Sequence, residues 1–240
     1  MNPIRDQWTS PDGAIRLILG DALEVLPTLD REGIGAVVTD PPYGMNCNTD
    51  WARFSGGHRD SIRKRGMGRT YDAPVVGDDR PFEPSPWLTF DKCVLWGCNH
   101  FAQRLPVGTT LVWIKRLDDA FGSFLSDAEL AWMKGGHGVY CRRDLSNNVK
   151  PENRKHPTQK PIGIMQWCLD LAKVSKGETV CDPYTGSGTT GVACIRTQRR
   201  FIGIEIERKY WEIAVGRCQQ ELGRFPLFEQ PVKPRQLELL

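Results

Sequence analysis

The chain has 240 residues, of which 40% are hydrophobic, which is enough for one α/β domain with insertions or for two small domains. Its formal net charge is only +3, so a nucleic-acid partner has to be argued from where the charge lies rather than from its sum. No run of about 18 apolar residues occurs, and the first residues lack the apolar core of a signal peptide, so we expect neither a membrane span nor a secretory leader.

The eight cysteines predict a reducing compartment. They form no C-x-x-C pair, so the spacing typical of a zinc site is missing. Cys93, Cys181 and Cys194 lie inside apolar runs, where a free cysteine behaves as a small hydrophobic residue. We therefore expect a cytoplasmic protein with no disulfide and no structural metal.

Short β-rich runs alternate along the chain with longer helical patterns, which favours an α/β fold with a parallel sheet and helices on both faces. The predicted strands are Ile15–Leu19, Ala36–Thr39, Val94–Gly97, Thr110–Ile114, Thr179–Cys181, Phe201–Ile204 and, more weakly, Leu130–Met133. The predicted helices are Ala22–Leu29, His100–Leu105, Ile162–Val174, Thr189–Thr197 and Tyr210–Arg224.

Two polar segments interrupt this alternation within what we interpret as a single domain spanning 1–240. Residues 44–85 are rich in Gly, Arg and Asp, and the part from Arg53 to Arg69 holds six basic residues against one acid. Residues 135–155 are similarly polar and are predicted to be irregular. Loops of this length in a compact domain are usually functional or disordered. Residues 226–240 are expected to form a loose tail.

The stretch TDPPYG, Thr39 to Gly44, directly follows a predicted buried strand. Neither proline has an N–H group, and both have a fixed φ angle, so the stretch is stiff. One interpretation is a rigid turn that only ends the strand. The other is a rigid shelf that presents one carboxylate, one carbonyl and one aromatic ring to a ligand.

A glycine loop, CDPYTGSGTTG, follows the predicted strand Thr179–Cys181 and opens a helix. Its G-x-G-x-x-G pattern, by itself weak, is typical of a close backbone approach to a ligand at a helix N-terminus. Glu205 lies 19 residues beyond Gly186, where an acid suits the two hydroxyls of a ribose. Asp182 precedes the glycines, which disfavours a pyrophosphate and suits the ammonium of a methionine moiety. The loop thus favours S-adenosylmethionine, with a nicotinamide dehydrogenase as the runner-up.

Four stretches in this order resemble the amino-methylating DNA methyltransferases that have the permuted β order of motifs. They are TDPPYG, HPTQKP (His156 to Pro161), CDPYTGSGTTGVA and FIGIEIERKYWEIA, with a weaker fifth match in GDALEVL. On its own, HPTQKP would be interpreted as a polar turn before a helix. The resemblance implies a Rossmann-like, seven-stranded, mostly parallel sheet with one antiparallel strand, circularly permuted so that the catalytic half precedes the cofactor half.

The resemblance also implies a reaction on the exocyclic amine of a flipped base. Asp40 and the Pro41 carbonyl would accept the two N–H bonds of the amine, Pro42 would stiffen the shelf, and Tyr43 would stack on the base. Contacts to S-adenosylmethionine are implied for Asp21, Thr158, Lys160, Asp182, Tyr184, Thr185, Gly186, Ser187, Gly188, Thr189 and Glu205.

The acid in DPPY favours adenine N6 as the target, by a tendency of the family in which cytosine-N4 enzymes more often have Ser. Cytosine N4 is the alternative, followed by an RNA or a protein-glutamine methyltransferase. A regulator built on an inactive fold is disfavoured because every motif residue is intact. The residues give no indication whether a restriction endonuclease accompanies the protein in a restriction-modification pair.

Double-stranded DNA is the expected partner. Phosphate contacts are predicted for the basic residues of 44–85, namely Arg53, Arg59, Arg63, Lys64, Arg65 and Arg69. Base reading is predicted for Arg142, Arg143 and Asn147, because Arg suits guanine and Asn suits adenine. The chain is short for this family, so we also expect a homodimer in which one subunit helps to hold DNA for the other.

Overall fold

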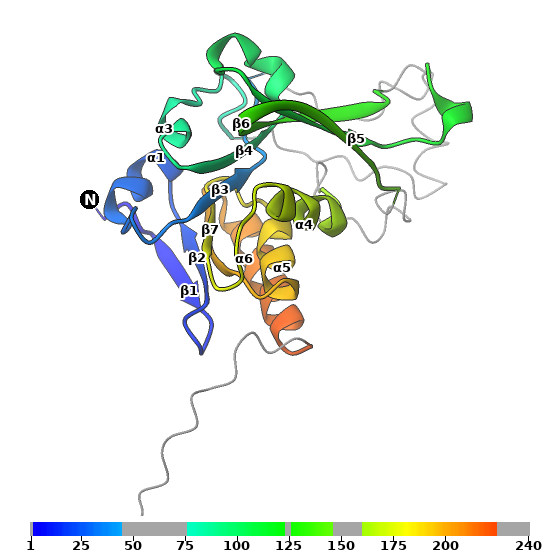
Figure 1. The fold of residues 1–240 in the computed structure, drawn as a ribbon. Helices are drawn as coiled ribbons and strands as arrows, with labels where there is room; N and C mark the ends of the chain where they lie inside the picture. Colours follow the sequence, from blue (N-terminus) through cyan, green and yellow to red (C-terminus); the bar gives the residue numbers. More distant parts are fainter. Residues whose placement is uncertain (1, 45–75, 123–125, 146–159, 225–240) are drawn as a thin grey trace, which may run out of the picture.

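A computed structural model describes residues 2–44, 76–122, 126–145 and 160–224 (Figure 1). The strands are β1 (Asp6–Thr9), β2 (Ile15–Leu19), β3 (Ala36–Thr39), β4 (Lys92–Trp96), β5 (Gly108–Ile114), β6 (Ala128–Arg143), β7 (Thr179–Asp182) and β8 (Arg200–Glu205). The α-helices are α1 (Ala22–Val25), α3 (Ser85–Leu88), α4 (Ile162–Leu171), α5 (Thr189–Arg196) and α6 (Arg208–Leu222). Short 3₁₀ turns are η1 (Leu26–Thr28), η3 (Cys98–His100), η4 (Ala102–Arg104) and η5 (Asp118–Ala120).

The strands form one mixed sheet in the order β1-β2-β8-β7-β3-β4-β6-β5. The Rossmann-like fold class is confirmed, but the sheet has eight strands rather than the expected seven. The additional strand is β1, which pairs antiparallel with β2 at one edge. Its four residues, DQWT, alternate only briefly between half-buried and exposed positions, which is too short a pattern to predict a strand. A second antiparallel pair joins β4 to β6, so the expectation of one antiparallel strand is also corrected.

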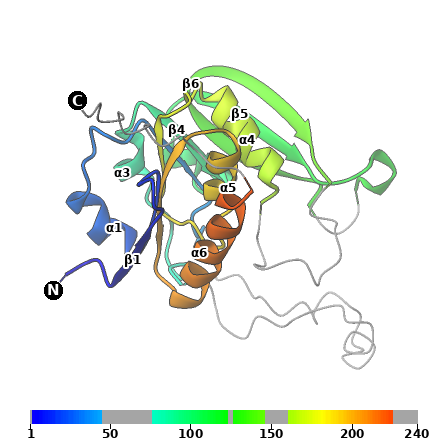
Figure 2. The same cartoon turned by 90° about the horizontal axis from the view of Figure 1, so that it is seen from below.

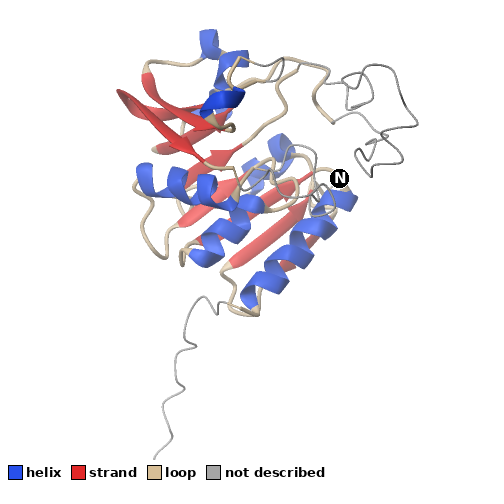
Figure 3. Cartoon of the chain, turned by 90° about the vertical axis from the view of Figure 1, so that its right-hand side faces the viewer, coloured by secondary structure: helices blue, strands red, loops and turns tan. Residues whose placement is uncertain are grey.

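Strand β6 doubles back around β5 and corrects the prediction that residues 135–155 are irregular. Its first part runs antiparallel to β5, with Val112 opposite Leu130, and its second part runs parallel, with Val112 also opposite Cys141. The reversal lies at Gly135 and Gly136, whose φ angles of 81° and 65° suit glycine. Residues 135–143 are therefore strand. Figure 3 shows this end of the sheet continuing beyond the layer of helices.

Helices cover both faces of the sheet, as the alternation of buried side chains in the strands requires (Figures 1 and 2). In β4, Val94 and Trp96 pack into the core shared with α4, α5 and α6. Cys93 and Leu95 point to the opposite face, into the core under α1 and α3. The predicted helix His100–Leu105 is corrected, because the chain forms the two 3₁₀ turns η3 and η4 there.

The sheet has its topological switch point between β3 and β7. These neighbours are parallel, and β3 is followed in the chain by β4 on one side, whereas β7 is followed by β8 on the other. Crevices outside the carboxyl ends of strands at such a point are where ligands bind in open α/β sheets. The fold therefore places TDPPYG and the glycine loop at adjacent positions on one edge.

Three predicted features fall outside the described residues: the six basic residues of the 44–85 insertion, the last part of 135–155, and the tail 226–240. Among the helices that the structure describes, none is long and apolar enough to cross a membrane.

Candidate active site

Four neighbouring strands each lead into an acidic residue at the same edge of the sheet. In the order β2, β8, β7 and β3, these residues are Asp21, Glu205, Asp182 and Asp40. All four strands are parallel to one another, so their carboxyl ends lie side by side. The fold thus brings together acids that lie as far apart as Asp21 and Glu205 in the chain.

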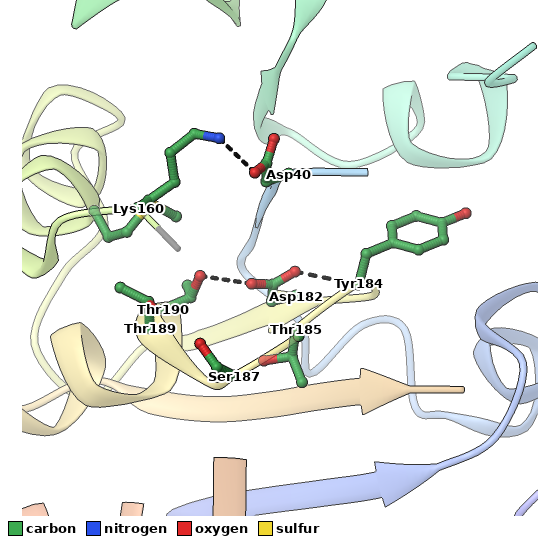
Figure 4. Close-up of a pocket in the computed structure, with 10 residues that line it drawn as sticks. Asp40, Lys160, Asp182, Tyr184, Thr185, Ser187, Thr189 and Thr190 are labelled. Atoms are coloured by element: carbon green, nitrogen blue, oxygen red, sulfur yellow. Dashed lines mark hydrogen bonds and ion pairs between the residues drawn. The ribbon is translucent and has the colours of Figure 1, made fainter. Parts of the chain in front are cut away.

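An open hollow lies over β3 and β7 (Figure 4). Its volume is about 380 Å³, which includes the solvent space at its mouth. It is lined by Asp40, Lys160, Met165, Asp182, Tyr184, Thr185, Gly186, Ser187, Thr189 and Thr190. Eight of these lining residues were predicted from the sequence. Met165 was not, because it lies in α4 with no distinguishing pattern apart from amphipathic spacing. Thr190 was not singled out either, although it lies within the stretch CDPYTGSGTTG.

Asp182 is buried at the end of β7 and connects three parts of the site. Its Oδ1 accepts hydrogen bonds from Thr39 Oγ1 at 2.6 Å and from the Tyr184 amide at 3.2 Å, and its Oδ2 accepts from Thr190 Oγ1 at 2.5 Å. Burial raises the pKa of Asp182 to about 6, although these three hydrogen bonds oppose the shift. The carboxylate therefore joins β3 to the first turn of α5.

The glycine loop closes over the N-terminus of α5. Gly188 is left-handed, with φ of 79°, and a Cβ there would lie 2.9 Å from the Cβ of Ala214 in α6. Arg217 of α6 donates from Nη1 to the Ser187 carbonyl at 2.5 Å, to Ser187 Oγ at 2.8 Å and to Thr189 Oγ1 at 3.2 Å. Nothing in the sequence indicates this role, since Arg217 looks like any helical surface arginine.

Glu205 holds the glycine turn from the end of β8. Its Oε2 accepts a hydrogen bond from the Gly186 amide at 2.8 Å, and its Oε1 accepts from the Glu207 amide at 2.9 Å. Burial raises the pKa of the Glu205 carboxyl to about 7, against the effect of these amide donors. The fold therefore brings this acid against the glycine loop, and its contact with a ribose stays a prediction.

Asp40 follows β3 directly and its side chain remains 19% exposed at the hollow. Its Oδ1 accepts a hydrogen bond from the Tyr43 hydroxyl, and its Oδ2 forms an ion pair with Lys160 (Figure 4). Pro41 is buried and Pro42 is half-buried. Burial raises the pKa of Tyr43 well above its usual range, and the neighbouring Asp40 carboxylate adds to the shift. Tyr43 is therefore a neutral hydrogen-bond donor.

Three residues that the sequence did not single out position Tyr43. His100 stacks on its ring, with a centroid distance of 4.8 Å and an interplanar angle of 13°. Gly97 is left-handed, and a Cβ there would lie 2.0 Å from the Tyr43 ring. Asp78 accepts from the backbone amides of Tyr43 at 3.1 Å and of Gly44 at 2.8 Å. The shelf is thus held on several sides.

Lys160 is 5% exposed and lies between two carboxylates. Besides Asp40 it contacts Glu129 Oε2 of β6 at 3.0 Å, and its ammonium lies 5.5 Å from the centre of the Trp96 ring. Burial would lower the pKa of Lys160, but Asp40 and Glu129 outweigh burial and raise it well above its usual range. The lysine is therefore charged. The sequence predicted Lys160 as a cofactor contact but missed its carboxylate partners.

Other predicted site residues lie elsewhere. Asp21 caps α1 by accepting from the Leu23 amide at 2.8 Å, and it is absent from the lining of the hollow. Arg142 and Arg143 are exposed on the second part of β6, where Arg143 forms an ion pair with Asp118. Thr158 and Asn147 are outside the described residues, together with Arg53, Arg59, Arg63, Lys64, Arg65 and Arg69.

The lining of the hollow suits a polar organic molecule. Thr185 Oγ1 is buried there and has no hydrogen-bond partner among the described residues, as expected of a group that a ligand satisfies. Within the same ranges, no group of three or more His, Cys, Asp or Glu side chains is arranged to hold a metal ion.

Comparison with known proteins identifies the family. The model of the N6_N4 DNA methylase family matches residues 107–216. The DNA adenine methyltransferase YhdJ of Escherichia coli K12 is 42% identical over an alignment of 250 positions. The alignment covers 84% of this chain and 81% of YhdJ. The chain belongs to the DNA methylase family.

Other similarities agree with this assignment. The chain is 44% identical over 137 residues to the Type II methyltransferase M2.DpnII of Streptococcus pneumoniae, a match that covers 56% of this chain and only 50% of that relative. Its fold matches the crystal structure of M1.HpyAVI in complex with S-adenosylmethionine, with a TM-score of 0.53 and 23% identity over 85% of this chain and 99% of that one. The resemblance to the amino-methylating DNA methyltransferases is confirmed at the level of the family.

The raised pKa of Glu205 predicts how the stability of the ligand-free methylase changes with pH. An acid with a pKa of about 7 in the folded state and 4.5 in the unfolded state binds a proton more readily when folded. Its contribution to stability therefore increases as pH falls from about 7 towards 4.5, by up to roughly 3 kcal/mol. Urea unfolding at pH 8 and at pH 5.5 measures this, and Glu205→Gln is expected to reduce the gain in stability at the lower pH.

Glu212→Gln is the matched control, because Glu212 is an exposed glutamate of α6. This control is expected to retain the wild-type pH dependence. An equal pH dependence in the wild type and in Glu205→Gln would contradict the assigned burial effect.

Proposed function

We propose that the protein transfers a methyl group from S-adenosylmethionine to the N6 amine of an adenine flipped out of double-stranded DNA. The observation that carries the proposal is the position of Asp40. Its carboxylate lines the same hollow as the glycine loop, so a target amine and a cofactor would meet there.

S-adenosylmethionine supplies a methyl group that is electrophilic because its sulfur carries a positive charge. The residues that would hold it are those around the glycine loop. Glu205 keeps lone pairs for the two hydroxyls of a ribose while it fixes Gly186. Asp182 lines the hollow, and its carboxylate suits an ammonium group. Thr185 Oγ1 offers a buried hydroxyl without a partner among the described residues.

Asp40 and the Pro41 carbonyl would orient the target amine. An exocyclic amine is a poor nucleophile because its lone pair is delocalised into the base. Two acceptors that take its two N–H bonds make the nitrogen pyramidal and direct the lone pair at the methyl group, and the carboxylate stabilises the positive charge that grows on nitrogen. Tyr43 adds a ring on which the base can stack once it has left the duplex.

Two facts support adenine over cytosine as the target. The shelf begins with Asp40, the residue that adenine-specific members of the family prefer, and YhdJ is named as an adenine methyltransferase. Cytosine N4 is the alternative, since its amine presents the same two N–H bonds.

Every described cysteine is free, which supports a reducing, cytoplasmic location.

Substitution of Asp40 tests the proposed reaction. Asp40→Ala removes an interaction made mainly in the transition state, so transfer should fall to below a few per cent of the wild-type rate while S-adenosylmethionine affinity stays within about threefold. Mass spectrometry of nucleosides from treated DNA identifies the product, and calorimetry gives the affinity. N4-methylcytosine as the product would select the alternative target.

Asp12→Ala is the matched control, because Asp12 is an acid in the turn between β1 and β2, away from the hollow. It is expected to retain the wild-type rate. Full activity in Asp40→Ala would refute the assigned role of this carboxylate.

We propose that Arg142, with Arg143 and Asn147, reads bases, whereas the six basic residues of the 44–85 insertion contact phosphates. Arg142→Ala should lower the discrimination between DNA sites. Replacing Arg63, Lys64 and Arg65 together by Ala should instead weaken binding to all sequences alike and reduce the log–log salt slope by about 0.9 for each phosphate that is no longer neutralised. Fluorescence anisotropy at several salt concentrations distinguishes the two effects, and an unchanged slope in the triple variant would exclude the phosphate contacts.

We also propose that two copies act together on DNA. Specific interfaces with DNA usually bury about 1,000–2,500 Å² of protein surface, which is a large area for one chain of this size. Sedimentation equilibrium, with and without DNA, is expected to give the mass of a homodimer. A monomer under both conditions would overturn this proposal and leave the proposed chemistry untouched.

A further inference from the structure

Glu129 lies outside every motif that identified the active site, yet it reaches the site through Lys160. It belongs to the first part of β6, and its Oε2 lies 3.0 Å from the Lys160 ammonium. Lys160 in turn forms the ion pair with Asp40 and lines the hollow. A carboxylate on a remote strand is therefore connected to the catalytic carboxylate by one shared lysine.

The two oxygens of Glu129 have separate partners. Oε2 faces Lys160, whereas Oε1 lies 3.0 Å from the ammonium of Lys115, which follows β5 directly. Burial would raise the pKa of Glu129, but Lys160 and Lys115 lower it to about 2. Glu129 is therefore a fixed negative charge, held between one buried and one half-buried lysine.

Both oxygens of the Asp40 carboxylate already have a partner in this structure. One oxygen accepts from the Tyr43 hydroxyl and the other is paired with Lys160. In the proposed reaction the target amine would donate to the same carboxylate, so it would share Asp40 with Lys160 and weaken their ion pair. A buried ammonium that lost its carboxylate partner would be strongly destabilised. Lys160 therefore needs a second carboxylate within reach, and Glu129 already contacts it.

We propose, on the basis of the proposed function, that Glu129 is a positioning residue of the methyl-transfer site. In the free enzyme, Glu129 holds the Lys160 ammonium beside Asp40. When the target amine binds to Asp40, Glu129 remains as the carboxylate partner of the Lys160 ammonium. The centre of the Trp96 ring lies 5.5 Å from the Lys160 ammonium, so this ring adds a cation–π contact. The pair of carboxylates lets Lys160 shift between them without becoming an isolated buried charge.

Glu129→Gln tests the proposal because it removes the charge and keeps the shape. Lys160 would then pair with Asp40 alone and compete with the target amine. We expect kcat to fall roughly 10- to 100-fold, as for a misplaced catalytic group, while the KM values for DNA and S-adenosylmethionine change less than about threefold. Glu129→Asp is expected to recover part of the rate because it restores the charge.

Glu178→Gln is the matched control. Glu178 forms an ion pair of similar kind with Lys92 at 2.7 Å, but at the amino ends of β7 and β4, the opposite edge of the sheet from the site. This control is expected to keep the wild-type kcat. A wild-type kcat in Glu129→Gln, or an equal loss of kcat in both variants, would overturn the positioning role.

A second measurement does not depend on activity. Carbon-13 NMR of the lysine Cε groups, with Lys160 assigned from a Lys160→Met variant, follows the titration of its ammonium without cofactor or DNA. Among the described residues, the charged or titratable groups that interact with it are Asp40, Glu129, Tyr43 and the Cys168 thiol. Glu129→Gln is expected to lower the pKa of Lys160, and an unchanged titration would overturn the proposal. A lowered pKa in a protein that methylates no DNA would instead count against the proposed function alone.

Discussion

The buried carboxylate of Asp182 joins β3 to the start of α5 beside the glycine loop, and the geometry of the site depends on it. Thr39, the residue directly before Asp40, donates to one of its oxygens at 2.6 Å, and Thr190 of α5 donates to the other at 2.5 Å. Hydrogen bonds to a charged group contribute about 1.5–3 kcal/mol each. The distance between Asp40 and the glycine loop is thus set by the fold itself, so the two halves are in register before either ligand binds.

The sequence predicted the central strands well for a physical reason. Ile15–Leu19 and Ala36–Thr39 are short apolar runs rich in β-branched residues and bounded by turn residues, and the structure has both with the same bounds. Buried parallel strands have this composition because both of their faces are covered. The acids that follow these runs were also recognisable, since the carboxyl ends of parallel strands meet at one edge. Motif order and strand ends together predicted most of the hollow.

The structural features that the sequence did not predict have no recognisable local pattern in the sequence. The second part of β6 begins with Gly135 and Gly136 and is exposed, so its residues look like a loop, and only pairing with β5 makes them a strand. Glu129 reaches Lys160 across 31 positions of sequence, and His100 reaches Tyr43 from a 3₁₀ turn that follows the next strand. Such contacts are consequences of the packed sheet, and no periodicity or spacing in the chain encodes them.

The charges of the hollow suit a cofactor that arrives as a cation and leaves as a neutral molecule. Asp40 and Asp182 line it with a single lysine, and Glu205 lies directly behind Gly186. Burial raises the pKa values of Asp182 and Glu205 to about 6 and about 7, so keeping these carboxylates ionised is costly in the free protein. A sulfonium and an ammonium would relieve that cost, because opposite charges attract strongly where water is excluded. In the proposed reaction, loss of the sulfonium charge on transfer would remove part of this attraction, so the acidic edge of the sheet would favour the substrate over the product and would help the product to leave.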